Sequence, residues 1–298
     1  MKFKNSLIFN ISGGLGKNII ATAVVKALKK QHPSKDIIIV SPHRDAWLNN
    51  PNVKEIVSIL YPKDEQVFYA QNGLDSDNTI LKLEPYSSED YFYKRKNLAA
   101  IWCDLYDIPY KKEKTELFIT DEETESAKKK INFKDGDKIF IIQPSGGAPG
   151  QPYPISWARD LPLPIADEVC EKMKKAGYRV IHIRRKDQKP LKDTEWFELT
   201  ARETFALIQL SDKRLLIDSF AQHAAAALNK PSVVTWVANS PKVFGYDMHT
   251  NILPEVKPSF RHTIDSFLEP YNIIGALHEY PYDTDRIYSV KKILEDLK

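Results

Sequence analysis

The polar residues best suited to bind a ligand or take part in a reaction follow an apolar run, residues 215–217. Asp218 and Ser219 come directly after this run, and a stretch of small residues that carries His223 follows them. The pattern predicts a strand, a turn and a helix, and a second strand after Pro231. The free N–H groups of such a helix attract an anion at the carboxyl edge of a parallel sheet, so the segment indicates a phosphate site. The alternative is that Asp218 or Ser219 caps the helix and His223 is an interior side chain.

A second group of polar residues follows two other strand-like runs, residues 138–142 and 179–183. Backbone N–H groups of a Ser-Gly-Gly turn can bind a diphosphate, and fixed arginines can neutralise a departing phosphate, so no metal is expected. The alternative for residues 184–188 is a solvated polar loop. The candidate phosphate-binding residues of this group are Ser145, Gly146, Gly147, Arg159, Arg184, Arg185, Asp187 and Gln188.

A glycine-rich turn, residues 12–18, follows the first strand-like run of the chain. It differs from the phosphate loop of ATPases because Asn18 stands where that motif has a hydroxyl for magnesium. Its glycines also lack the spacing of a dinucleotide-binding loop. A glycine turn lets a ligand approach the backbone closely, so Gly13, Gly14 and Lys17 are candidates for binding an acceptor or a phosphate. The alternative is a tight turn that has only a structural role and binds no ligand.

Composition narrows the class of protein. The chain has 298 residues, 42% of them hydrophobic and 28% charged, which suits two globular domains. The net charge of +3 argues against an extended nucleic-acid surface, although a local basic patch could still bind phosphates. Cys103 and Cys170 are too few for a disulfide framework. No apolar run is long enough to span a bilayer, and the first residues lack a signal-peptide core, so we expect a cytoplasmic protein.

Strand-like and helix-like runs alternate along the chain, which is typical of an α/β protein. We predict a first α/β domain over residues 1–125, a second α/β domain over 126–275, and a C-terminal helix over 276–298 that packs on a domain face. The expected helices include residues 18–30, 88–106, 121–131, 163–176, 201–210 and 283–298, and the expected strands include 7–11, 37–40, 53–59, 138–142 and 179–183.

Several separated motifs together resemble those of family 9 glycosyltransferases, the heptosyltransferase-like enzymes. They are Gly13-Gly14-Leu15-Gly16, residues 21–30, Asn50-Pro51-Asn52-Val53, residues 143–147, Trp157, residues 217–219, His223 and Lys230-Pro231. The resemblance covers roughly residues 6–250 in the same order, and residues 157–160 and 211–214 are similar to short phage-type variants. It implies the GT-B fold: two Rossmann-like domains with parallel sheets facing across a cleft. The acceptor would bind to the first domain, residues 1–125, and the nucleotide-sugar donor mainly to the second, residues 126–275, where the polar residues listed above would be donor-binding.

The chain departs from this family at two positions. The family usually has an Asp directly after the glycine turn as the base that deprotonates the acceptor, and here Lys17 stands there. The family also has a Lys at the position of Ile155, so Arg159 is a candidate to bind phosphate instead. Another carboxylate or a histidine must then serve as base. The candidates on the N-terminal domain are His43, Asp45, Glu89 and Asp90.

The resemblance implies a metal-independent glycosyltransferase, inverting at the anomeric carbon, with a nucleotide-diphosphate sugar as co-substrate and no further cofactor. Its acceptor is a glycan hydroxyl or, from the phage-type resemblance, a modified base of phage DNA, which would place the protein in the host cytoplasm. Two alternatives stay open. The first is an inactive GT-B module that binds a nucleotide sugar without transferring it, and the second is a nucleotide-sugar epimerase.

Overall fold

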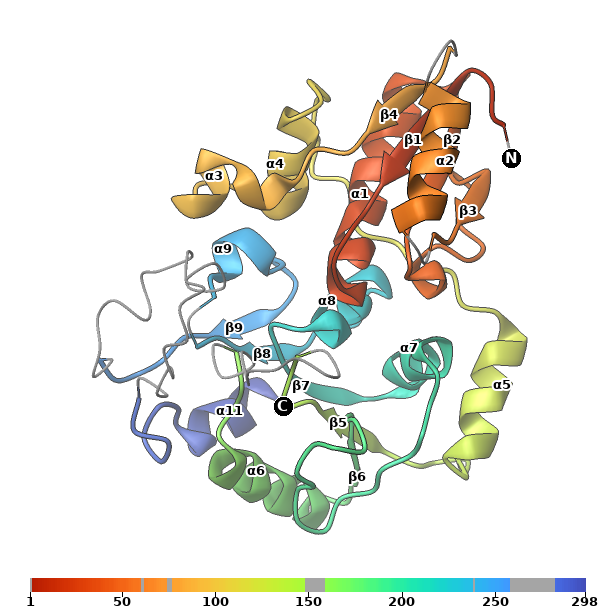
Figure 1. Ribbon diagram of the computed structural model, residues 1–298. Helices are drawn as coiled ribbons and strands as arrows, with labels where there is room; N and C mark the ends of the chain where they lie inside the picture. Colours follow the sequence, from red (N-terminus) through yellow and green to blue (C-terminus); the bar gives the residue numbers. More distant parts are fainter. Residues whose placement is uncertain (1, 60–61, 74–76, 148–158, 238, 258–281) are drawn as a thin grey trace. The chain divides into compact units, whose positions relative to one another are not determined.

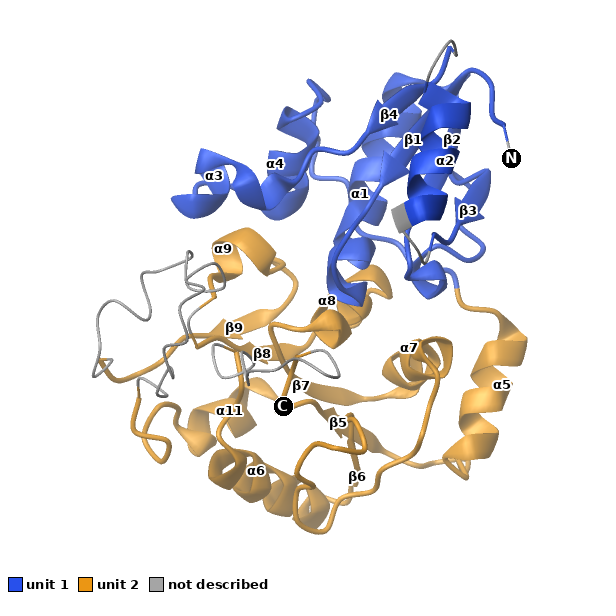
Figure 2. Cartoon of the chain, viewed as in Figure 1, with its two compact units in different colours: residues 1–118 blue, residues 119–298 orange. Residues whose placement is uncertain are grey.

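The computed structural model describes residues 2–59, 62–73, 77–147, 159–237, 239–257 and 282–298 (Figure 1). The chain divides into two compact units, Met1–Phe118 and Ile119–Lys298 (Figure 2). The second unit therefore begins ahead of helix α5 (Asp121–Lys130), which our predicted boundary at residue 125 would cut. The helix belongs to the second unit because Arg202 forms an ion pair with Glu123 at 2.6 Å.

Unit 1 contains a four-stranded parallel sheet in the order β3-β2-β1-β4. Its strands are β1 (Ser6–Asn10), β2 (Asp36–Val40), β3 (Glu55–Val57) and β4 (Thr79–Leu81). Leu7 lies opposite Ile37 on one side and Thr79 on the other. The central strands β1 and β2 are apolar and almost fully buried, which explains why a short sheet can anchor the unit.

The helices of unit 1, which lie between and after these strands along the chain, differ greatly in length. They are α1 (Leu15–Gln31), η1 (Arg44–Ala46), α2 (Pro62–Gly73), η2 (Pro85–Ser87), α3 (Glu89–Phe92) and α4 (Leu98–Asp104). The single helix that we predicted over residues 88–106 is wrong. Lys94 has a φ of 52°, which ends the first helix, and the side chain of Asn97 accepts a hydrogen bond from the N–H of Ala99 and starts the second.

Unit 2 contains a five-stranded parallel sheet in the order β6-β5-β7-β8-β9. Its strands are β5 (Ile139–Ile142), β6 (Arg179–His182), β7 (Lys213–Ile217), β8 (Val233–Thr235) and β9 (Thr250–Ile252). The helices described beside α5 are α6 (Leu163–Lys175), α7 (Ala201–Leu210), α8 (Phe220–Ala227), α9 (Pro241–Phe244) and α11 (Val290–Asp296).

The C-terminal helix begins at Val290 and not at residue 283 as predicted, because Ser289 caps it by accepting a hydrogen bond from Lys292. Its apolar residues Ile293 and Leu297 join one core with α6 and the sheet. Among the described residues, no helix is long and apolar enough to cross a membrane.

Candidate functional site

The strand order of each unit defines one place where a ligand is expected. In an open parallel sheet, a crevice forms at the carboxyl edge where successive connections leave a strand in opposite directions. In unit 1 this point lies between β1 and β4, and in unit 2 it lies between β5 and β7. The glycine turn at residues 12–18 follows β1, and Asp218 and Ser219 follow β7. Both motifs singled out in the sequence therefore lie at switch points.

In unit 2, the two strand ends at the switch point are joined by side chains. The amide of Gln143 donates a hydrogen bond to the Ser219 hydroxyl at 3.3 Å, and Arg159 Nη1 donates to the carbonyl oxygen of Asp218 at 3.3 Å. Arg159 Nε is buried and has no hydrogen-bond partner among the residues that the structure describes. A side chain on Gly146 would place its Cβ 2.8 Å from Cδ of Arg159, so the glycine allows this close approach. The arginine is thus held beside Asp218 with hydrogen-bonding capacity to spare.

Asp218 lies in a buried cluster of polar side chains. Its carboxylate accepts hydrogen bonds from Asn239 and, at 3.4 Å, from Gln222, and His223 Nε2 lies 3.9 Å from Oδ1. Burial raises the pKa of Asp218 although the Arg159 charge acts in the opposite direction. Burial thus acts against the charged form of Asp218, and Arg159 acts in its favour.

His223 is an uncharged member of the same cluster. Burial lowers its pKa to about 3, so the ring is neutral at physiological pH. Its Nδ1 lies 3.0 Å from the hydroxyl of Tyr246. Ser219 is the N-cap residue of α8, but its hydroxyl makes no capping hydrogen bond and is instead the acceptor for Gln143. The simple helix-cap interpretation of Ser219 therefore does not hold.

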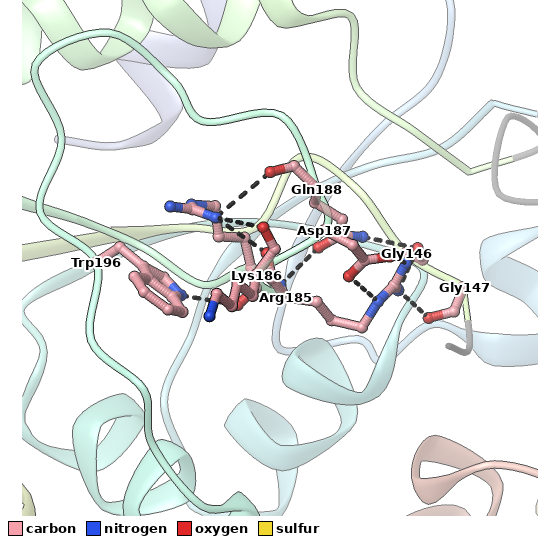
Figure 3. A network of polar contacts seen from close by, with 8 residues as sticks. Gly146, Gly147, Arg185, Lys186, Asp187, Gln188 and Trp196 are labelled. Carbon is pink, nitrogen blue, oxygen red and sulfur yellow. Dashed lines mark hydrogen bonds and ion pairs between the residues drawn. The ribbon is translucent and has the colours of Figure 1, made fainter. Parts of the chain in front are cut away.

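A network of polar contacts connects the turn after β5 to the loop after β6 (Figure 3). Arg185 Nη1 donates to the carbonyl oxygens of Gly146 and Gly147 at 3.3 and 2.6 Å, and Gln188 also donates to Gly146 at 3.0 Å. Asp187 forms an ion pair with Arg185 at 2.9 Å. The predicted donor-binding residues of these two segments thus lie together. The N–H of Gly146, which we expected to face a diphosphate, donates to Asp160 at 2.9 Å.

Beside this network, the described residues form a pocket of about 220 Å³ after β6. The guanidinium of Arg184 stacks at 4.4 Å over the ring of Trp196, whose Nε1 donates to the carbonyl oxygen of Arg184 at 3.0 Å. Nη1 of Arg184 donates to the carbonyl oxygen of Arg185 at 3.1 Å. Arg184 is therefore a wall of this pocket. We predicted Arg184 as a phosphate ligand but did not single out Trp196, which is a half-buried aromatic at the end of an irregular segment.

Unit 1 contains a larger pocket, of about 520 Å³, at its own switch point. Gly13 and Lys17 come from the glycine turn and its helix, and Lys82 and Glu84 follow β4. Its remaining lining residues are Asn10, Ile11, Ser12, Val40, Ser41, Pro42, Ile59, Glu65, Leu83 and Trp102. Gly14 is the N-cap of α1, and a Cβ added to it would meet no atom within 4 Å, so open space lies beside the turn.

Lys17 does not stand free in this pocket. Its Nζ lies 2.7 and 2.5 Å from the two carboxylate oxygens of Glu84, and it lies over the rings of Tyr86 and Trp102 at 4.7 and 5.2 Å. Burial lowers the pKa of Lys17, and the hydrogen bond that it donates to Glu84 opposes this effect. A second lysine in the pocket, Lys82, is paired in the same way with Glu65 at 2.6 Å.

The four base candidates from the sequence lie outside the residues that line this pocket. His43 precedes η1 and Asp45 lies within it, while Glu89 and Asp90 lie in α3. The hydrogen bond from Lys96 lowers the pKa of Asp90, which also pairs with Arg95 at 3.5 Å. The pocket carboxylates Glu65 and Glu84 were missed. The signal that would have found Glu84 is its place three residues after the end of a strand, but β4 itself was not predicted.

Fold and pockets together define an α/β protein with two Rossmann-like units, each with a polar pocket or cluster at a switch point. Comparisons with family models and with curated protein sequences find no match. Comparison with solved structures finds proteins of similar fold. The chain is similar to a family 9 glycosyltransferase from Veillonella parvula, with 12% identity, a TM-score of 0.66, and coverage of 98% of this chain and 95% of that one.

The chain is also similar to the ADP-heptose heptosyltransferase II of E. coli, with 14% identity, a TM-score of 0.68, and coverage of 98% of this chain and 97% of that one. E. coli heptosyltransferase WaaC, solved with ADP, aligns at 8% identity and a TM-score of 0.55 over 84% of this chain and 92% of that one. The protein therefore has the fold of the family 9 glycosyltransferases, and the fold class predicted from the sequence is confirmed.

Proposed function

We propose that the protein transfers a glycosyl group from a nucleoside-diphosphate sugar to an acceptor hydroxyl. The observation that carries this proposal is the glycosyltransferase fold over 98% of the chain. A cluster of arginines and hydroxyl groups at the switch point of the second unit gives it a chemical basis. Unit 2 binds the donor in this proposal, and the pocket of unit 1 binds the acceptor.

The pocket after β6 suits the base of the donor nucleotide. Trp196 offers a half-buried aromatic face, and Arg184 is stacked on it at 4.4 Å. Stacking on aromatic rings and on guanidinium planes is a common way to bind a nucleobase of any identity. We therefore assign the base of the donor to this pocket, and a screen of donor nucleotides would identify that base.

The diphosphate of the donor then lies near the carboxyl ends of β5 and β7. Arg159 is held there beside Asp218, and its Nε has no partner in the described part of the chain, while Arg185 is fixed on the Gly146–Gly147 turn. Fixed cations stabilise the charge that develops on a departing nucleoside diphosphate. We therefore propose a transfer in which arginines neutralise the leaving group, with inversion at the anomeric carbon.

The acceptor in this proposal is a glycan hydroxyl, with a modified DNA base as the competing possibility. A protein that neutralises many phosphates loses affinity steeply as salt rises. Salt-dependent binding of double-stranded DNA would therefore favour the nucleic-acid acceptor. The two lysines that line the unit 1 pocket are each paired with a carboxylate, which favours the uncharged glycan hydroxyl.

A thermal-shift screen against ADP-, UDP-, GDP- and CDP-sugars tests the donor assignment. A ligand at about 100 times its Kd stabilises the folded state by roughly 2.7 kcal/mol, which is visible as a raised Tm. Trp196→Ala is expected to weaken binding by about 1–3 kcal/mol through lost stacking, while Trp196→Phe keeps most of the affinity. If none of the four donors raises the Tm of the wild type, the proposal fails.

One alternative function has an observation in its favour. Lys17, and not a carboxylate, follows the glycine turn, which would suit a module that binds a nucleotide sugar without transferring it. A measurement of turnover distinguishes the transferase from the binding module. Release of nucleoside diphosphate from a donor that raises the Tm supports the transferase, and binding without release supports the module.

A further inference from the structure

We propose that Glu84 is the base that removes the proton from the acceptor hydroxyl, and that Lys17 is its positioning residue. This inference depends on the proposed glycosyl transfer. It assigns a role to the pocket of about 520 Å³ in unit 1, and it replaces the four base candidates that the sequence suggested.

The backbone around Glu84 is fixed at the switch point of the unit 1 sheet. The residue follows β4, whose neighbour in the sheet is β1, the strand that leads into the glycine turn. The N–H of Leu83 donates to the hydroxyl of Tyr106 at 2.7 Å, and Trp102 Nε1 donates to the carbonyl oxygen of Leu83 at 3.2 Å. Two aromatic side chains thus hold the segment that presents the carboxylate to the pocket.

Four donor contacts fix the carboxylate itself. Lys17 Nζ lies 2.7 Å from Oε1 and 2.5 Å from Oε2, the Ser12 hydroxyl donates to Oε2 at 3.2 Å, and the N–H of Tyr86 donates to Oε1 at 3.3 Å. The pair is asymmetric in exposure, since the side chain of Lys17 is 5% exposed and that of Glu84 is 35% exposed. The ammonium therefore lies behind the carboxylate, and the carboxylate faces the space that a ligand can enter.

Other carboxylates of unit 1 fit this role less well. Glu65 also lines the pocket, but it comes from helix α2 and is paired with Lys82, a lysine whose side chain is 57% exposed. Asp90 lies outside the pocket lining and is paired with Lys96 at 2.8 Å. Only Glu84, among these three, is held by the glycine turn and by the strand end at the switch point.

In the proposed step, the acceptor O–H gives its proton to the carboxylate of Glu84, and its oxygen forms a bond to the anomeric carbon of the donor. The bond from that carbon to the phosphate oxygen breaks, and the nucleoside diphosphate leaves with the electron pair. The Lys17 ammonium stays behind Glu84 and holds its carboxyl group in place during the transfer.

The test uses release of nucleoside diphosphate by the full chain, with the donor that gives the largest thermal shift. Water is the nucleophile in one arm, and azide, an anion with no proton to lose, is the nucleophile in the other. The variants are Glu84→Gln, Glu84→Ala, and Glu116→Gln as a matched control. Glu116 is likewise paired with a lysine of α1, Lys26, but lies outside the pocket lining.

We expect Glu84→Gln to slow release to water by about 10²–10⁴-fold, the usual contribution of a general base. The donor-induced thermal shift of this variant should stay at the wild-type value, and Glu116→Gln should keep the wild-type rate. Azide should restore release in Glu84→Ala, because it needs no base. A purely structural role for Glu84 would give a loss that azide leaves unchanged.

Each other result has a distinct meaning. Wild-type rates in Glu84→Gln, or a loss in Glu84→Ala that azide leaves unrepaired, overturn the assignment of Glu84 and leave the transferase function standing. A wild type that binds a donor but releases no nucleoside diphosphate to either nucleophile overturns the proposed function, and the base with it.

Discussion

Replacing Glu203 by Gln should destabilise unit 2 in a way that depends on pH. The carboxylate of Glu203 is buried at the start of α7, where the Ser126 hydroxyl donates to it at 2.8 Å and Lys130 Nζ also lies at 2.8 Å. The N–H and hydroxyl of Thr200 donate to it at 2.9 and 3.0 Å. A glutamine amide has one oxygen and cannot accept all four of these hydrogen bonds.

The size of the effect follows from the pKa of Glu203. Burial alone would raise this pKa, but the hydrogen bonds from Lys130, Thr200 and Ser126 outweigh burial and lower it from 4.5 to about 2. The difference between these values corresponds to about 3 kcal/mol. Because the side chain of Lys130 is 44% exposed, solvent screens the pair, and we expect a loss of about 2 kcal/mol at pH 7.

The sign of the pH dependence follows from the lowered pKa. The contribution of Glu203 is complete above pH 4.5, the value of the unfolded chain, and is lost as the pH falls from there through about 2. Urea unfolding of the wild type and of Glu203→Gln, at pH 7 and near pH 3, measures the contribution of Glu203 to the free energy of unfolding. The difference between the two proteins should be large at pH 7 and fall to less than half of that value near pH 3.

A matched control separates the buried carboxylate from a surface ion pair. Glu125 lies on α5, is 68% exposed and pairs with Lys128 at 2.8 Å, so Glu125→Gln should change the free energy of unfolding by less than about 1 kcal/mol. Equal destabilisation by Glu203→Gln at both pH values would refute the electrostatic explanation. So would an effect no larger than that of Glu125→Gln.

Two further outcomes are expected in stability measurements. Gly245→Ala should cost about 1–3 kcal/mol in urea unfolding, because its Cβ would lie 2.5 Å from the carbonyl oxygen of Pro241. Gly14→Ala should cost less, because its Cβ meets no atom within 4 Å and only the poor N-cap preference of alanine opposes it. Equal effects would contradict the steric explanation. Burial lowers the pKa of His182 and His249 from 6.5 to about 4, so the stability that each contributes is present above pH 6.5 and is lost towards pH 4, by up to about 3 kcal/mol each. Their ring proton NMR signals should not titrate between pH 7 and 5, and a midpoint near 6.5 would show that the rings are accessible.

The sequence predicted elements best where local signals agree with the tertiary structure. Helix α7 was predicted with its observed bounds, because an apolar stretch follows Thr200, which forms a capping box with Glu203. Helix α2 and strand β4 were missed. The helix has almost no apolar face, and the strand has three residues, so neither carries a periodic pattern that a single sequence reveals.

Contacts between residues at the ends of neighbouring strands can be expected from the sequence, whereas pairs that depend on side-chain direction cannot. Ser219 and Gln143 follow adjacent parallel strands, so their contact at 3.3 Å follows from the fold alone. Lys17 and Glu84 are separated by 67 positions, and their pairing depends on an unpredicted strand. A sequence motif thus located the glycine turn but left the partner of its lysine unknown.

The charges at the two switch points favour different ligands, which supports our proposal that unit 1 binds the acceptor and unit 2 binds the donor. In unit 1, the two lysines of the pocket face two carboxylates, Lys17 with Glu84 and Lys82 with Glu65, so the charged groups cancel. In unit 2, Arg159 has a buried Nε without a hydrogen-bond partner among the described residues. An anionic ligand is attracted by this arginine. The nucleoside diphosphate therefore fits unit 2, and a neutral hydroxyl group that gives up a proton fits unit 1.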